Sequence, residues 1–245
     1  MNPSGETLDV LCDGRLTLYQ SRSGYRFSID TLLLAAYVSI KRGDRVVDLG
    51  TGNGVIPLVL AQRHASAAFV GVELQSAMVE RARRNVCLNK LDARIRIVGG
   101  DVRRPRTLAP PASFDVAVCN PPYRKPSSGR ISPDHERQIA RHELTAELND
   151  FLHAGAFLVR EKGQMALVYP AVRSTDLIFA LRQARLEPKR LRAVHSFHGT
   201  EASLLLVEAV KGGRAGLKIL PPLILYREAQ RLTAEAAAIL AGLRP

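Results

Sequence analysis

Beginning at Arg45, the sequence alternates between short apolar runs and longer runs of helical periodicity, and this alternation restricts the fold more than any other feature. Short runs rich in β-branched residues predict strands. Strands are expected at 45–50, 68–73, 94–101, 114–123 and 164–170, and helices at 55–65, 76–90, 144–160 and 175–186. Strands that alternate with helices predict a parallel sheet covered on both faces, which is an α/β fold.

The two ends of the chain depart from this alternation. Segments 191–197 and 202–210 follow one another with no helix between them, which predicts an antiparallel pair at the sheet edge, and 227–240 predicts a final helix. We expect a Rossmann-like domain over residues 45–245, with a central seven-stranded, mostly parallel sheet and an antiparallel edge strand. Residues 1–44 form a short N-terminal extension, a lid or strand pair followed by a helix near Thr31–Ser39, which is too short to fold alone.

The chain is strongly basic, with 35 Lys and Arg against 23 Asp and Glu and a formal net charge of +12. This charge favours a polyanionic partner, with nucleic acid first, although a basic proteome gives the same excess. The longest apolar run is far shorter than the ~20 residues that span a bilayer. The 3 cysteines are odd in number and none forms a CxxC pair, so we expect no disulfide scaffold, no metal site and a cytoplasmic, soluble protein.

A glycine-rich turn follows the first expected strand and opens the first expected helix. It has the pattern D-x-G-x-G-x-G, from Asp48 through Gly50 and Gly52 to Gly54. A dinucleotide fingerprint would place its third glycine at position 55, where the chain has Val55. The pattern resembles instead the cofactor loop of S-adenosylmethionine-dependent methyltransferases, which need close backbone contact and an acidic acceptor for the ammonium group of the cofactor.

Three acidic residues end three successive strands. Asp48 lies at the first, Glu73 closes the second and Asp101 closes the third. Because parallel strands present their carboxyl ends at one edge of the sheet, the three carboxylates are expected on the ligand-binding edge. There Glu73 would accept the ribose hydroxyls and Asp101 the adenine amine of S-adenosylmethionine.

The sequence Asn-Pro-Pro-Tyr, residues 120–123, ends the fourth strand. Two prolines remove two backbone donors and stiffen the turn, which leaves the Asn120 side-chain oxygen and the Pro121 carbonyl as acceptors beside the Tyr123 ring. A conjugated exocyclic amine is a poor nucleophile because its lone pair is delocalised. Two acceptors that hold both N–H bonds favour a pyramidal nitrogen whose lone pair can attack a methyl group, so the motif predicts catalysis by positioning.

Four blocks together carry a more specific resemblance: GYRFSIDTLLLAAYV, DLGTGNG, NPPY and GLKILPPLILY. The chain resembles the bacterial tRNA (adenine-N6) methyltransferases that modify an anticodon-loop adenine of valine tRNA. The resemblance implies a class I methyltransferase with S-adenosylmethionine as donor, S-adenosylhomocysteine as product and tRNA as partner, acting as a monomer or homodimer. It also implies a base that is flipped out of its stack onto Tyr123.

The resemblance assigns site residues as well. Asn120, Pro121 and Tyr123 would be catalytic, and Arg124, Lys125 and Arg130 in the polar loop 124–143 would contact RNA. Tyr25, Phe27 and Asp30 would cover the cofactor, although core packing explains Phe27 equally well. The residues expected to contact the cofactor are Asp48, Gly50, Thr51, Gly52, Gly54, Glu73, Leu74, Asp101, Val102 and Asn120.

Three alternatives share the same motifs. A protein-glutamine N5-methyltransferase of the release-factor type acts on an amide nitrogen, which is a poor nucleophile for the same reason. Such enzymes carry a larger N-terminal helical domain than 44 residues allow. An rRNA guanine-N2 methyltransferase also acts on an exocyclic amine. A non-catalytic S-adenosylmethionine- or RNA-binding module would not need Asn120 and Tyr123.

Overall fold

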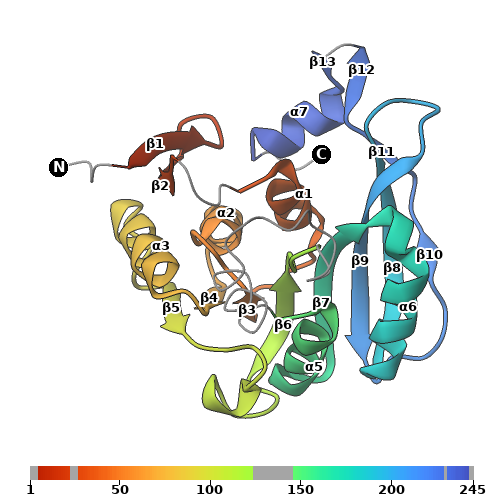
Figure 1. The fold of residues 1–245 in the computed structure, drawn as a ribbon, viewed down its shortest axis with the longest axis horizontal. Coiled ribbons are helices and arrows are strands. Elements are labelled where there is room, and N and C mark those ends of the chain that lie inside the picture. The colour runs from red at the N-terminus through yellow and green to blue at the C-terminus, as the bar shows by residue number, and fades with distance from the viewer. Residues whose placement is uncertain (1–4, 23–26, 124–145, 229–230, 243–245) are drawn as a thin grey trace, which may run out of the picture.

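The computed structural model describes residues 5–22, 27–123, 146–228 and 231–242 (Figure 1). The strands of the described chain are β1 (Glu6–Leu11), β2 (Leu16–Ser21), β3 (Arg45–Leu49), β4 (Ala68–Glu73), β5 (Ile95–Gly99), β6 (Phe114–Cys119), β7 (Val159–Pro170), β8 (Leu186–His195), β9 (Ala202–Lys211), β10 (Lys218–Ile219), β11 (Leu223–Ile224), β12 (Tyr226–Glu228) and β13 (Arg231–Leu232). Its helices are α1 (Ile29–Tyr37), α2 (Val55–Arg63), α3 (Ser76–Leu88), α5 (Leu148–Leu158), α6 (Ser174–Gln183) and α7 (Ala234–Leu240), with short 3₁₀ turns η1 (Pro105–Thr107) and η2 (Ala171–Arg173).

The central sheet confirms the predicted α/β architecture. Its strands lie in the order β10-β8-β9-β7-β6-β3-β4-β5, and β11 also pairs with β8. All pairings are parallel except those of β9, which runs antiparallel to both β7 and β8. The sheet therefore has nine strands because two short strands extend the expected seven, and its antiparallel strand lies inside the sheet, one position in from β8.

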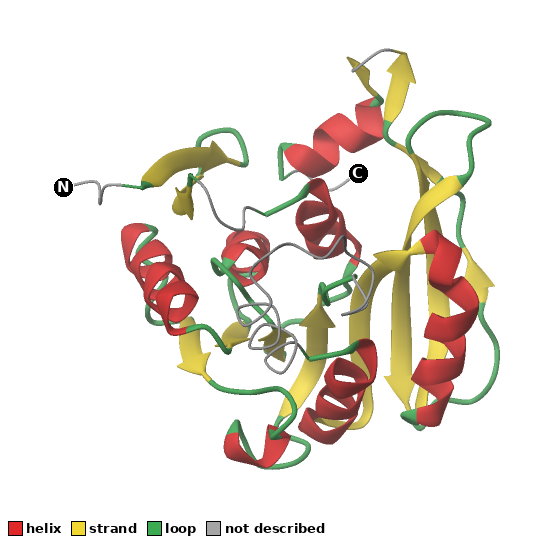
Figure 2. Ribbon diagram, in the orientation of Figure 1, coloured by secondary structure: helices red, strands yellow, loops and turns green. Residues whose placement is uncertain are grey.

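Helices cover both faces of this sheet, so side chains alternate between two hydrophobic clusters (Figure 2). Val46 of β3 and Val116 of β6 face α1, α2, α3 and α7, whereas Val47 and Ala117, their sequence neighbours, face α5 and α6. Strands buried on both faces read as continuous apolar runs, which is why the sequence marks them so clearly.

The N-terminal extension forms the expected strand pair and helix. Strands β1 and β2 pair antiparallel through a turn at Cys12–Gly14, and α1 follows. Leu16 and Leu18 of β2 and Leu33 and Leu34 of α1 belong to the same hydrophobic cluster as α2 and α3. The extension thus buries its apolar side chains against the main domain.

Two amide side chains of α3 fasten β2 to the domain. The Asn85 Oδ1 accepts the backbone N–H of Tyr19 at 2.7 Å, and its Nδ2 donates to the Tyr19 carbonyl at 3.1 Å. One turn later Asn89 makes the same pair of bonds with Thr17, at 3.0 and 2.7 Å. The two amides act as a substitute for a neighbouring strand, because they pair the free backbone edge of β2.

The C-terminal tail differs from the single helix expected at 227–240. Residues of its first half form the short pair β12–β13, and α7 begins only at Ala234. The Thr233 hydroxyl decides this boundary, because it caps α7 by accepting from the Ala236 N–H at 3.1 Å and donates to the Ile224 carbonyl at 2.7 Å. Among the described residues, no helix is long and apolar enough to cross a bilayer.

Candidate active site

The turn between β3 and α2 brings backbone groups to the carboxyl edge of the sheet. Gly50, Gly52 and Gly54 have φ angles of +75°, +56° and +81°, which L side chains rarely adopt. A Cβ on Gly50 would also lie 3.1 Å from the ring of Phe151. Glycine is therefore required here both by conformation and by space, and Gly54 serves as the N-cap residue of α2.

Polar groups in this turn are buried without partners. Asp48 is 2% exposed, and neither of its carboxylate oxygens has a hydrogen-bond partner among the described residues. The Thr51 hydroxyl and the Asn53 side-chain nitrogen are buried and unpaired in the same described set. Burial raises the pKa of Asp48 to about 7; the adjacent Thr51 side chain lowers it and the charge of Glu73 adds to the rise. Buried polar groups are normally paired, so this cluster marks a place for a polar ligand.

Glu73 ends β4 beside the glycine turn and is 7% exposed. Its Oε2 accepts the Gly52 N–H at 3.0 Å, and its Oε1 accepts the Gln75 N–H at 2.9 Å. Each oxygen retains capacity for a second hydrogen bond, because an ionised carboxylate has about four lone-pair sites. Glu73 therefore both shapes the turn and can accept vicinal hydroxyl groups.

The third strand-end acid already has a cationic partner. Both oxygens of Asp101 accept hydrogen bonds from the Arg103 guanidinium, at 2.8–3.0 Å, and Oδ1 also accepts the Arg103 N–H at 2.9 Å. Arg103 holds the pKa of the Asp101 carboxyl below its ordinary value, against the opposing effect of burial. Beside these acids, Leu74 is 40% exposed at the rim, and Val102 is buried against α5 and the sheet.

The Asn-Pro-Pro-Tyr segment lies directly beside the glycine turn. Leu49 pairs with Cys119 in the β3–β6 register, so Asn120 and Gly50 leave neighbouring strands at the same level. The Tyr123 hydroxyl lies 2.6 Å from Asn120 Oδ1 and can donate to it. The motif thus folds back on itself, with the tyrosine hydroxyl on the amide oxygen.

Helix α1 of the extension reaches the same motif. Asn120 Nδ2 donates to the Thr31 hydroxyl at 3.4 Å, and the Tyr123 hydroxyl lies 3.1 Å from Asp30 Oδ2. Thr31 is buried and Asp30 is half-buried in the first turn of α1. The structure therefore brings together Asp48, Glu73, Asn120, Tyr123 and Asp30, which the sequence analysis had selected separately.

Comparison with known proteins identifies the family of the chain. Residues 23–172 match the model of the methyltransferase small domain. The chain belongs to this methyltransferase family. It is 32% identical over 206 residues to a protein of Porphyromonas gingivalis named tRNA1(Val) (adenine(37)-N6)-methyltransferase, covering 82% of this chain and 80% of that one. A protein of the same name from Tolumonas auensis is 31% identical over 183 residues, covering 71% of this chain and 75% of that one.

A solved structure shares the fold. It is a predicted O-methyltransferase of Agrobacterium tumefaciens, with a TM-score of 0.71 and 26% identity over 87% of this chain and 96% of that one. The resemblance inferred from the four sequence blocks is therefore confirmed. The methyltransferase domain match begins within the extension and ends in η2, so it includes α1, the glycine turn and the Asn-Pro-Pro-Tyr segment.

Two residues at this candidate site were not predicted from the sequence. Tyr169, at the end of β7, packs its ring edge-on against Tyr123, with centroids 5.9 Å apart and an interplanar angle of 89°. Thr31 is the partner of Asn120 already described. Tyr169 lies near the carboxyl end of an apolar strand, so attention to the strand ends would have found it. Thr31 had no such signal, because its contact depends on how α1 packs.

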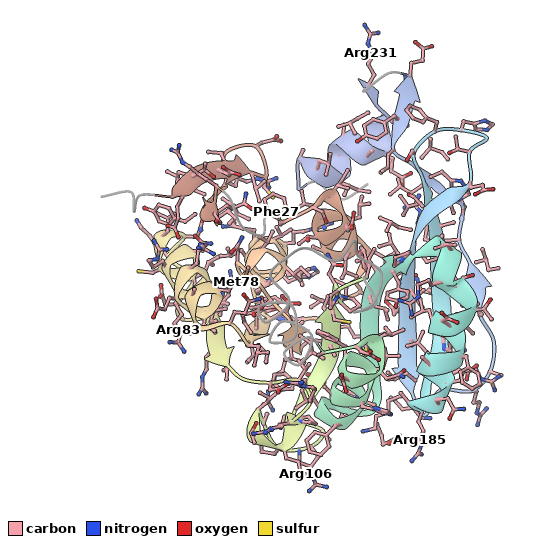
Figure 3. The ribbon with its side chains drawn as sticks, viewed as in Figure 1. Phe27, Met78, Arg83, Arg106, Arg185 and Arg231 are labelled. Carbon is pink, nitrogen blue, oxygen red and sulfur yellow. The ribbon has the colours of Figure 1, made fainter. Side chains whose placement is uncertain are left out.

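Phe27 lies between the β1–β2 hairpin and α1 (Figure 3). It packs against the cluster of α1 and α2 and lines an open cavity between the β1–β2 turn and α7. Its backbone N–H donates to Gln20 Oε1 at 3.1 Å, so it helps to seat the hairpin. Tyr25, Arg124, Lys125 and Arg130 lie outside the described residues, and the structure places none of them.

Proposed function

We propose that this methyltransferase transfers a methyl group from S-adenosylmethionine to N6 of an adenine in tRNA, with adenine 37 of a valine tRNA as the first candidate. One observation carries the proposal. A cluster of buried acceptors at Asp48, unpaired within the part of the chain that the structure describes, lies beside an asparagine–proline acceptor pair, because β3 and β6 are neighbours in register. The names of the relatives support the choice of adenine and tRNA.

The residues at the strand ends fit the proposed cofactor. Asp48 offers an ammonium group two oxygens that have no partner among the described residues, and Glu73 offers its remaining lone pairs to ribose hydroxyls. Gly50, Gly52 and Gly54 have no side chains that would block close approach to the backbone. When bound, S-adenosylmethionine supplies a methyl group on a sulfonium, which is a strong electrophile. Asp101 could accept an adenine amine, provided that it shares its oxygens with Arg103.

Asn120 and Pro121 supply the proposed chemistry. The Asn120 Oδ1 and the Pro121 carbonyl would accept the two N–H bonds of the target amine and direct its lone pair toward the methyl carbon. A nitrogen–carbon bond then forms as the sulfur–carbon bond breaks, and the amine loses one proton afterwards to solvent. No strong base is needed before attack, so preorganised acceptors account for catalysis here.

Tyr123 provides the aromatic surface for the base. A stacked adenine inside a helix would leave its amine out of reach, so we propose that the base turns out and rests against this ring. The basic side chains of the described chain are widely spread, with Arg106 and Arg185 at one end and Arg231 at the other (Figure 3). We propose that the net charge of +12 contributes general affinity for RNA and that Arg124, Lys125 and Arg130 act closer to the site.

The decisive experiment is methyl transfer from radiolabelled S-adenosylmethionine into an unmodified valine tRNA transcript, followed by nucleoside analysis. We expect N6-methyladenosine, and no label in a matched transcript with guanosine at position 37. The Asn120→Ala variant serves as the inactive control. Label in guanine, or in glutamine-bearing proteins instead of tRNA, would refute the adenine assignment.

A further inference from the structure

The Tyr123 hydroxyl faces two acceptors at once. It lies 2.6 Å from Asn120 Oδ1 and 3.1 Å from Asp30 Oδ2. A phenol has one proton to donate, so it satisfies one of the two oxygens at a time. The arrangement is a competition between an amide oxygen on the β6 edge and a carboxylate on α1.

Asn120 Oδ1 is also the oxygen that the proposed reaction needs. While the Tyr123 hydroxyl donates to Asn120 Oδ1, that oxygen is engaged before any amine arrives. The other end of the amide is fixed, because Nδ2 donates to the buried Thr31 hydroxyl. The amide therefore keeps its orientation toward Tyr123, and the hydroxyl occupies one of the two lone pairs of Oδ1. The amine meets the full acceptor strength of Oδ1 once the hydroxyl donates to another acceptor.

Asp30 is held in place to be that acceptor. It lies in the first turn of α1, and the same helix buries Leu33 and Leu34 in the core. The Tyr123 ring is constrained as well, because it packs edge-on against Tyr169, which is buried in the core. The Arg173 guanidinium lies 5.1 Å from the centroid of the Tyr169 ring. A small rotation of the hydroxyl changes its acceptor while the ring stays available for stacking.

We propose that Asp30 is a positioning residue, which takes the hydrogen bond of the Tyr123 hydroxyl and so releases Asn120 Oδ1 for the target amine. The inference rests on the proposed amine chemistry and gives Asp30 a role other than contact with the cofactor. Hydrogen bonds to a charged acceptor are stronger than those to a neutral one, so a bond to Asp30 compensates the hydroxyl for the bond to Asn120 that it gives up. Asp30 acts through Tyr123 and does not touch the reacting atoms.

The test is a comparison of Asp30→Ala, Tyr123→Phe and the double variant, with the valine tRNA transcript as substrate. Asp30→Ala leaves Asn120 as the acceptor of the hydroxyl, so we expect kcat to fall about tenfold while the Kd of S-adenosylmethionine stays within about twofold. In the Tyr123→Phe background no hydroxyl competes. There Asp30→Ala has no further effect, and the double variant turns over faster than Asp30→Ala alone.

Two further variants separate this role from a structural one. Asp30→Asn keeps a neutral acceptor, so it recovers part of the lost turnover. Asp92→Ala removes an exposed acid from the turn between α3 and β5 and controls for the loss of one negative charge. Melting temperatures of all variants, measured alongside, show whether a loss of kcat follows a loss of folded protein.

The outcomes are decisive in each direction. An equal loss from Asp30→Ala in the wild-type and Tyr123→Phe backgrounds overturns the proposal, and so does a large rise in the Kd of S-adenosylmethionine with kcat intact. If the wild-type chain labels guanine or a glutamine side chain, the adenine assignment fails and the same comparison, made on that amine, still decides the role of Asp30. A wild-type chain that labels no amine in RNA or protein overturns both.

Discussion

Two regions of the molecule bury polar side chains, and they differ in whether these side chains have hydrogen-bond partners. At the seam between α3 and the β1–β2 hairpin, Asn85 is fully buried, and its amide makes three hydrogen bonds, to the N–H and carbonyl of Tyr19 and to the Asn53 carbonyl. Glu6, also buried, accepts from Arg81 and Arg84. At the glycine turn, the Asp48 carboxylate, the Thr51 hydroxyl and the Asn53 side-chain nitrogen are also buried, but they have no partners among the described residues.

This difference distinguishes buried polar groups that stabilise the fold from those that bind a ligand. A satisfied buried amide contributes specificity and stability, because its removal leaves backbone groups unpaired. An unsatisfied buried carboxylate lowers stability, and a chain retains it only if a ligand supplies the missing partner. Substitutions in the seam should therefore lower the free energy of unfolding. Substitutions in the turn should weaken ligand binding and leave the free energy of unfolding unchanged or higher.

The largest expected effect is on the pH dependence of stability at Asp48. Its folded-state pKa of about 7 exceeds the ordinary value near 3.8, so the folded chain binds more protons than the unfolded chain between these values. The free energy of unfolding then falls as pH rises through that window, by an amount on the order of 4 kcal/mol at most. Asp48→Asn removes this dependence, so we expect the variant to be more stable than wild type at pH 8 and to differ little from it at pH 4.

Urea unfolding of both proteins across this pH range isolates the effect as a difference, since Glu6, Asp101 and Asp115, whose folded-state pKa values are lowered, titrate equally in both. The same variant should bind S-adenosylmethionine at least about tenfold more weakly, because a charge-assisted hydrogen bond is lost. A variant less stable than wild type at pH 8 would show that Asp48 is a structural group.

Asn120→Ala tests the other side of the site. We expect kcat to fall by about 10²–10³, the usual cost of removing one preorganised hydrogen-bonding group from a transition state. The Kd of S-adenosylmethionine and the melting temperature should change little, because the Asn120 side chain is only half-buried and its hydrogen bonds within the described chain are to side chains. Unchanged turnover would remove Asn120 from the mechanism.

Asn85→Ala and Asn89→Ala form a matched pair within the seam. Asn85→Ala leaves the Tyr19 backbone and the Asn53 carbonyl unpaired, so we expect it to lower the free energy of unfolding by about 2–3 kcal/mol. Asn89→Ala affects the half-exposed end of the seam at Thr17 and should cost about 1 kcal/mol. Urea unfolding measures both.

The pair of variants also tests whether the seam and the glycine turn are energetically coupled. Asn85 contacts the glycine turn through Asn53, and Asn89 does not, so only Asn85→Ala should weaken S-adenosylmethionine binding. Equal affinities in the two variants would mean that the seam and the turn are independent.

The sequence predicted those parts of the molecule whose chemistry is local. Gly50 and Gly54 need positive φ, and Asn120 follows a buried strand, so the turn and the motif could be placed on one sheet edge without a structure. The contact between Asp30 and Tyr123 joins residues 93 positions apart and depends on the packing of α1, which no local pattern records.

Helix α3 shows the same limit. Its residues Arg81 and Arg84 bind Glu6 of the hairpin, a contact between distant segments that no local pattern records. The prediction of a single helix at 227–240 was wrong for a related reason. The tertiary contact of Thr233 with Ile224 overrides the helical preference of residues 227–232. Local composition cannot show which surface another segment will cover.

The smallest expected effect lies at Asp101, which belongs to the ligand-binding edge but, unlike Asp48, already has a cationic partner. The Arg103 side chain is 35% exposed, so Arg103→Ala should change the free energy of unfolding by about 0.5 kcal/mol or less. If Asp101 accepts the adenine amine of the cofactor, loss of the competing guanidinium should leave the Kd of S-adenosylmethionine unchanged or lower it by up to about threefold. Calorimetric titration measures this change. A tenfold weaker affinity would show instead that Arg103 contacts the cofactor, and Asp101 and Arg103 would then bind it together as a pair.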